Sequence, residues 1–141
     1  MIVRDLRCAG TTACLDVIQD ALSGLWDDAP DVDGTDRMLF ETALVEIVGN
    51  LVEHARTPTG APVTITAQVA VHADRVEARL TDDGIAPPLD LTVDTPPPDE
   101  MAEGGRGLSL ARAVAEVMHD RSPEGNVWTV TRRRAGEQPY R

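Results

Sequence analysis

The chain contains no lysine, and all 13 of its basic residues are arginine. A Walker-type phosphate-binding loop requires a lysine, and so does catalysis through a lysine Schiff base. The sequence therefore excludes both classes of site. It also lacks any apolar run close to the roughly 18 residues that a membrane-spanning helix needs. We therefore expect no contact with a membrane.

Basic residues are outnumbered by acidic ones, which gives the chain a formal net charge of −11. Nonspecific binding of nucleic acid depends on a basic surface, so we expect no direct nucleic-acid partner. The excess of acid favours solubility, and an acidic face that docks a basic protein is the alternative. With 141 residues, 42% of them hydrophobic, the chain is long and apolar enough for one folded domain.

Cysteine is scarce too, since only Cys8 and Cys14 are present. They have no histidine or cysteine partners at a spacing typical of metal sites, so we expect both to be reduced and structural. Charged residues interrupt the short apolar part of the N-terminal "MIVRDLRCAG", which is therefore not typical of a secretory signal. We expect a cytoplasmic protein.

The periodicity of apolar residues predicts an α+β fold. We expect a two-layer sandwich in which helices pack on one face of a mostly antiparallel, mixed sheet. A single domain is expected over residues 1–134, followed by a loose tail at 135–141. The predicted strands span 2–8, 63–71, 75–81 and 126–134, and the predicted helices span 11–26, 35–55 and 108–120.

The predicted helix 35–55 has one apolar side, which we expect to be buried against the sheet. The residues assigned to that side are Met38, Phe40, Ala43, Leu44, Ile47, Val48, Leu51 and Ala55.

Polar groups on the other side of this helix form a candidate site. Glu46, Asn50 and His54 recur every fourth residue and are expected to stack along one line. Asn50 and its neighbour Gly49 are both unfavourable in a helix interior, which indicates a close approach at this face. Asn50 has an oxygen that suits Mg²⁺, and Glu46 can orient a hydroxyl or water that attacks a phosphate, or take its proton. An ordinary solvated helix face is the alternative.

Two glycine-containing stretches add to this candidate site. Asp82 and Gly84 follow a predicted strand, where the carboxylate can accept a hydrogen bond from an exocyclic amine and the glycine can let a flat ring approach the backbone. A plain Asp-Gly turn is the alternative. The segment between this strand and the next helix holds five prolines and no periodicity, so a lid at about 86–104 is expected, with disorder as the alternative.

The second stretch, "EGGRGLSLARAV", begins at Glu103 and leads into the last predicted helix. Free N–H groups and the positive end of the helix dipole favour an anion there. Arg106, between Gly105 and Gly107, can add a full positive charge. A flexible hinge before an ordinary helix is the alternative.

The motifs "ExxxNxxxHA", "DxG" and "GGRGLxL", in this order, resemble the N, G1 and G2 boxes of the GHKL superfamily of ATPases and kinases. The chain looks most similar to the short bacterial anti-sigma factor serine/threonine kinases of the RsbW and SpoIIAB type. The resemblance implies a Bergerat ATP-binding fold, Mg²⁺ and ATP as cofactors, and a homodimer. It also implies two partners, which are a sigma factor and a STAS-domain anti-anti-sigma protein.

The same resemblance assigns roles to individual residues. Glu46 matches the general base, Asn50 the Mg²⁺ ligand, and Asp82 the carboxylate that reads the adenine amino group. The remaining residues that the resemblance assigns to ATP binding are His54, Gly84, Gly105, Arg106, Gly107, Leu108 and Thr129.

One position departs from the family pattern, because Ala86 stands where the G1 box usually has its second glycine. Two functions are therefore weighed. The first is a kinase that phosphorylates the STAS-domain protein and sequesters the sigma factor. The second is a noncatalytic, nucleotide-binding regulatory module that acts through protein contacts. An ATP domain of a split histidine kinase is a weaker alternative.

Overall fold

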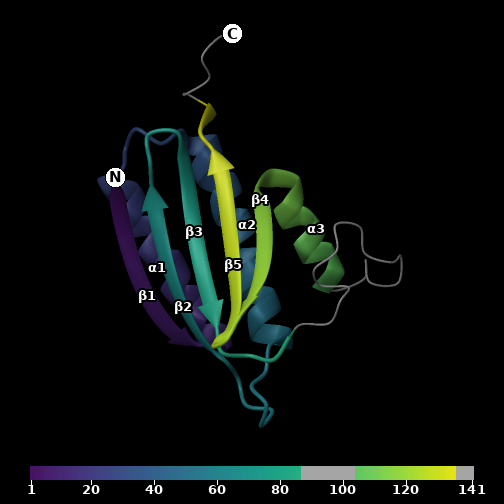
Figure 1. Ribbon diagram of the computed structural model, residues 1–141. Coiled ribbons are helices and arrows are strands. Elements are labelled where there is room, and N and C mark those ends of the chain that lie inside the picture. The colour runs from purple at the N-terminus through teal and green to yellow at the C-terminus, as the bar shows by residue number, and fades with distance from the viewer. Residues whose placement is uncertain (87–103, 136–141) are drawn as a thin grey trace.

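A computed structural model describes the fold over residues 1–86 and 104–135, with side chains described for 1–86 and 108–135. Five antiparallel strands form one sheet in the order β1-β2-β3-β5-β4, and the helices cover one face of it (Figure 1). The elements are β1 (Ile2–Ala9), α1 (Thr12–Asp28), α2 (Gly34–His54), β2 (Thr64–Val71), β3 (Arg75–Asp82), α3 (Gly104–Val114), β4 (Glu116–Ser122) and β5 (Gly125–Arg133).

This architecture confirms the predicted α+β fold with helices on one sheet face. Among the described residues, no helix combines the length and the apolar character of a membrane span. Most of the predicted lid at about 86–104, and nearly all of the predicted tail at 135–141, lie outside the described residues.

The prediction of a helix over 108–120 was wrong at both ends. Helix α3 begins at Gly104 and ends at Val114, and residues 116–122 form the edge strand β4 instead. The apolar residues Val114, Val117 and Met118 continue a helical spacing, and they concealed the alternation of the strand. Pairing with β5 decides the outcome, since Val117 lies opposite Val130 in an antiparallel hairpin.

The core lies between α2 and the inner face of the sheet. Seven of the eight apolar residues assigned to the buried side of α2 are buried or half-buried, whereas Met38 is 60% exposed. At about 100° per residue, Met38 lies outside the arc centred on Ile47, so its assignment to the buried side was wrong. The buried positions of β2 and β3 alternate along each strand, as expected for a sheet covered on one face.

A disulfide joins Cys8, near the end of β1, to Cys14, in the first turn of α1. The prediction of two reduced cysteines was therefore wrong. Only Gly10 and Thr11 separate the strand from the helix, and the Cα atoms of the two cysteines are 5.5 Å apart, within the range that a disulfide spans.

A buried ion pair ties the beginning of α2 to β5. Asp36 is 1% exposed, and its Oδ1 accepts a hydrogen bond of 3.0 Å from Arg132 Nε. The same guanidinium donates from Nη1 to the carbonyl oxygen of Val114 at the end of α3. Helices α2 and α3 and strand β5 therefore meet at the guanidinium of Arg132.

A second arginine clamp lies nearby. Arg134, 8% exposed, donates to the carbonyl oxygen of His72 and to the carboxylate of Asp31. The hydrogen bond from Arg134 lowers the pKa of Asp31 below its usual value.

We expect Asp36→Ala to lower the free energy of unfolding by about 3 kcal/mol, because it leaves Arg132 largely buried without its partner. Urea denaturation measures the change. Asp28→Asn is the control, since Asp28 pairs with Arg4 at the surface and should matter by less than about 0.5 kcal/mol. Equal effects of the two substitutions would contradict this account.

Candidate functional site

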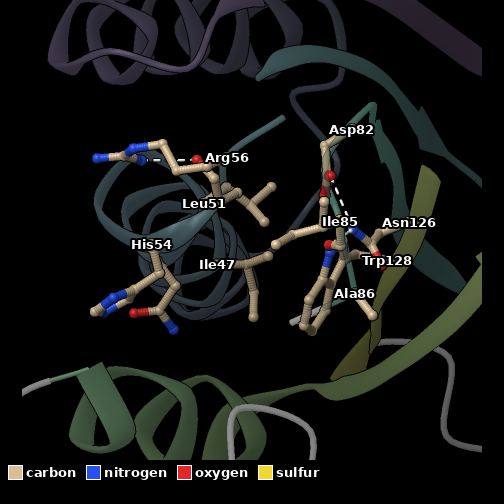
Figure 2. Close-up of a pocket in the computed structure, with 11 residues that line it drawn as sticks. Ile47, Leu51, His54, Arg56, Asp82, Ile85, Ala86, Asn126 and Trp128 are labelled. Carbon is tan, nitrogen blue, oxygen red and sulfur yellow. Dashed lines mark hydrogen bonds between the residues drawn. The ribbon is translucent and has the colours of Figure 1, made fainter. Parts of the chain in front are cut away.

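A cavity of about 340 Å³ lies between the second half of α2 and the ends of β3 and β5 (Figure 2). This volume falls in the range of small-molecule sites, and apolar walls with a few polar groups are typical of them. The lining residues are Ile47, Asn50, Leu51, His54, Ala55, Arg56, Asp82, Ile85, Ala86, Asn126 and Trp128.

Asp82 is the central polar group of this cavity. It is the last residue of β3 and is 3% exposed. Its Oδ1 accepts hydrogen bonds from the backbone N–H of Gly84, at 2.8 Å, and from Asn126 Nδ2, at 2.9 Å. Its Oδ2 is buried and has no hydrogen-bond partner within the described part of the chain. A buried acceptor without a partner is costly, so Oδ2 suits a hydrogen-bond donor of a ligand.

Gly84 packs closely against the side chain of Asp82. A Cβ at this position would lie 2.9 Å from Asp82 Oδ1 and 2.9 Å from Val63 Cγ1, closer than real Cβ contacts. Gly84 is not among the residues that line the cavity. The glycine therefore allows the close packing beside the Asp82 carboxylate, and its predicted contact with a ring stays a prediction.

Asn126 was not anticipated from the sequence. It is 3% exposed, and its side chain connects Asp82 on β3 with His119 and Arg121 on β4. One signal was present, because asparagine is uncommon within strands. Strand β4, which supplies two of its partners, was itself missed.

Trp128 is a second residue of the cavity wall that was missed by sequence reasoning. Its ring packs on His119, with 4.5 Å between ring centroids. Its Nε1 is buried and also has no hydrogen-bond partner among the residues described. Two buried polar atoms of lining residues, the acceptor Asp82 Oδ2 and the donor Trp128 Nε1, therefore lack a partner within the described part of the chain.

Strand alternation explains why Trp128, and not Thr129, lines the cavity. Successive side chains of β5 point to opposite faces of the sheet. Trp128 therefore points toward α2, whereas Thr129 points away from it, opposite Arg79 and Met118 of the neighbouring strands.

Helix α2 contributes Asn50 and His54 to the cavity but not Glu46. Glu46 instead lines a separate hollow of about 500 Å³ with Trp26, Arg37 and others. Because a helix has 3.6 residues per turn, positions four apart drift by about 40° around its axis. The predicted line of three polar side chains therefore winds around α2, and Glu46 faces a different part of the surface.

The predicted close approach at Gly49 is absent from the described structure. A Cβ at Gly49 would meet nothing within 4 Å. No described part of the protein therefore makes the close approach that was expected at this face of α2.

The predicted phosphate-binding glycines lie in the first turn of α3 rather than in a loop before it. The helix begins at Gly104, so its free N–H groups belong to 104–107. Leu108 follows and is 3% exposed, as part of the core. The side chain of Arg106 lies outside the described residues, and its role stays a prediction.

The comparison with protein families agrees with the fold. A family model described as "histidine kinase-like ATPase domain" matches residues 11–132, which include α2, Asp82 and Asn126. This match confirms the predicted superfamily, while the anti-sigma kinase branch stays a prediction. A search of curated proteins found none that matches the chain.

We expect Gly84→Ala to destabilise the fold by about 1–3 kcal/mol, because the new Cβ overlaps Asp82 and Val63. Gly49→Ala is the matched control, since a Cβ there is free of contacts and alanine favours a helix by about 0.5–1 kcal/mol. Thermal and urea unfolding measure both. A Gly84→Ala variant as stable as the unmodified protein would refute the packing role of this glycine.

Proposed function

Because the chain belongs to the histidine kinase-like ATPase domain family, we propose that it is an ATP-dependent protein kinase and anti-sigma factor. It phosphorylates a serine or threonine of a STAS-domain anti-anti-sigma protein. It sequesters a sigma factor when that protein is phosphorylated. The observation that carries the nucleotide part of this proposal is the free, buried Oδ2 of Asp82 in an apolar cavity of suitable size.

The chemistry of the adenine ring suits the part of the cavity around Asp82. Its exocyclic amino group is a donor, which Asp82 Oδ2 lacks in the described structure. Apolar surface is supplied by the side chain of Ile85 and the planar ring of Trp128, which line the same cavity (Figure 2). The base therefore satisfies a polar atom and buries apolar area in a single placement.

The phosphates are assigned to the side of the cavity that α2 lines, because α3 packs beside α2. Asn50 lines the cavity and offers an amide oxygen to Mg²⁺, which prefers oxygen ligands. Helix α3 packs beside α2, and its first turn contains Gly105, Arg106 and Gly107. Backbone N–H groups at a helix start hold phosphate oxygens well. Bound Mg²⁺ neutralises phosphate charge in such sites.

Glu46 is assigned the proton transfer. It accepts the proton of the attacking hydroxyl as that oxygen bonds to the γ-phosphorus and the bond from the γ-phosphorus to ADP breaks. In the described structure Glu46 is half-buried and faces its own hollow, so this role requires its side chain to turn toward Asn50.

The position of Glu46 also favours a second candidate function. A protein that binds ATP without transferring its phosphate needs Asp82 and Asn50 but not Glu46. The presence of Ala86 in the cavity wall, where the family pattern has glycine, points the same way. In this case the chain acts as a nucleotide-dependent regulatory module through protein contacts.

The partners follow from the same proposal. The protein acts as a homodimer in the cytoplasm, where ATP and sigma factors are found. Its acidic character, with a net charge of −11, suits a basic surface on a partner protein.

The kinase function predicts phosphotransfer from radiolabelled ATP to a STAS-domain protein of the same genome. We expect Glu46→Gln to slow transfer by about 10²- to 10⁴-fold while leaving the dissociation constant of ATP nearly unchanged. We expect Asn50→Ala to weaken Mg²⁺-ATP binding as well as transfer. Asp20→Asn is the control, because Asp20 is an exposed carboxylate on α1, away from the cavity.

Calorimetry with Mg²⁺-ATP separates the two candidate functions. Tight binding without transfer to any STAS-domain protein of the genome would favour the noncatalytic module. Absence of nucleotide binding would refute both.

A further inference from the structure

The orientation of the Asn126 side-chain amide is fixed by its surroundings. Its Nδ2 faces three acceptors, at 2.9 Å from Asp82 Oδ1, 3.0 Å from the carbonyl oxygen of Ile85 and 3.5 Å from that of Gly84. Its Oδ1 lies 3.0 Å from Arg121 Nη1, which can only donate. A flipped amide would place its nitrogen against the guanidinium, so only one orientation is compatible with these contacts.

The partners of Asn126 on β4 are fixed in turn. Arg121 Nη1 also donates to the carbonyl oxygen of Gly84, at 2.8 Å, and so joins β4 to the turn behind Asp82. His119 Nε2 lies 2.9 Å from Asn126 Oδ1, and because this oxygen can only accept, Nε2 must carry a proton.

This arrangement decides how the Asp82 carboxylate can bind a ligand. Asn126 Nδ2 and the N–H of Gly84 together occupy Oδ1. Only Oδ2 is left without a partner in the described structure. Asp82 therefore offers one oxygen to a ligand, and the second oxygen is withheld from it.

A single acceptor discriminates between purines. Adenine presents one exocyclic amino group at this edge of the ring, which one carboxylate oxygen satisfies. Guanine presents two adjacent donors, at N1 and at its amino group, which suit a carboxylate with both oxygens free. Guanine also places a carbonyl acceptor where adenine has its amino group.

We propose that Asn126 is a specificity-determining positioning residue, which selects adenine over guanine by occupying one oxygen of Asp82. Arg121 and His119 hold Asn126 in place, so the edge strand β4 takes part in base recognition without lining the base contact itself. This inference rests on the proposed binding of nucleotide in the cavity.

The test measures binding by calorimetry for ADP, GDP and purine riboside 5′-diphosphate, which differs from ADP only in lacking the amino group. For the unmodified protein we expect ADP to bind about 10- to 100-fold more tightly than the purine riboside analogue, as a hydrogen bond to a charged acceptor implies. In Asn126→Leu, we expect the preference for ADP over GDP to fall to within about threefold, because Oδ1 of Asp82 is then open to a second donor of the ligand, whereas the preference for ADP over the analogue, which depends on Oδ2, should remain.

The affinity of the purine riboside analogue should stay nearly the same in Asn126→Leu, because this ligand makes no amino contact. A loss that was merely structural would weaken all three ligands alike. Val127→Thr is the matched control, since Val127 is the next residue of β5 and its side chain points to the opposite face of the sheet. It should keep both preferences.

Arg121→Met provides a second variant on the exposed edge strand, and it removes one of the donors that hold Asn126. We expect this variant to lower the preference for ADP over GDP at least threefold. Should Asn126→Leu fail to fold, this variant alone decides the question, and an unchanged preference overturns the proposal.

The outcomes separate this inference from the proposed function. If the unmodified protein prefers ADP over GDP and a folded Asn126→Leu variant keeps that preference, nucleotide binding stands and the role of Asn126 is refuted. If the unmodified protein binds the three ligands equally, base reading by Asp82 is refuted as well. If it binds none of them, the proposed function itself fails.

Discussion

The candidate site depends on a difference in hydrogen bonding between the two carboxylate oxygens of Asp82. One oxygen is held by Gly84 and Asn126, and the other is buried without a hydrogen-bond partner in the described structure, in a residue that lines the apolar cavity. The backbone of Asp82 is also closely packed. Gly125 has a φ of +150°, and a Cβ there would collide with the main-chain carbonyl oxygen of Asp82. The β3–β5 pairing places Asn126 beside Asp82, the turn after β3 supplies the N–H of Gly84, and the edge strand β4 supplies the contacts to Asn126.

Local patterns in the sequence were sufficient for the features that are local in the structure. Helix α2 and the strand that ends at Asp82 were predicted to within a residue or two, because their periodicity reflects which face they bury. The joint motif also led to the correct superfamily. Asn126 and β4 could not be predicted in this way, since their roles depend on pairing between strands and on hydrogen bonds to residues about 40 positions earlier in the chain.

Glu46 shows how a correct pattern leads to an incomplete site. Its spacing from Asn50 predicts neighbouring side chains on a helix, and the two are indeed one turn apart. The drift of the helix nevertheless places Asn50 in the cavity and Glu46 in a separate hollow. Binding and catalysis are therefore supported to different degrees. The apolar walls and the buried acceptor on Asp82 support the proposed binding of a purine base, whereas the proposed phosphotransfer also requires Glu46 to change its orientation.

A crystal structure of the protein with ADP and Mg²⁺ tests the central claim most directly. It should show the exocyclic nitrogen of adenine within about 3.2 Å of Asp82 Oδ2. Asn126 should still occupy Oδ1, and the phosphates should point toward Asn50 and the first turn of α3. A nucleotide bound elsewhere on the molecule, or a base in the cavity that leaves Oδ2 without a donor, would contradict the account.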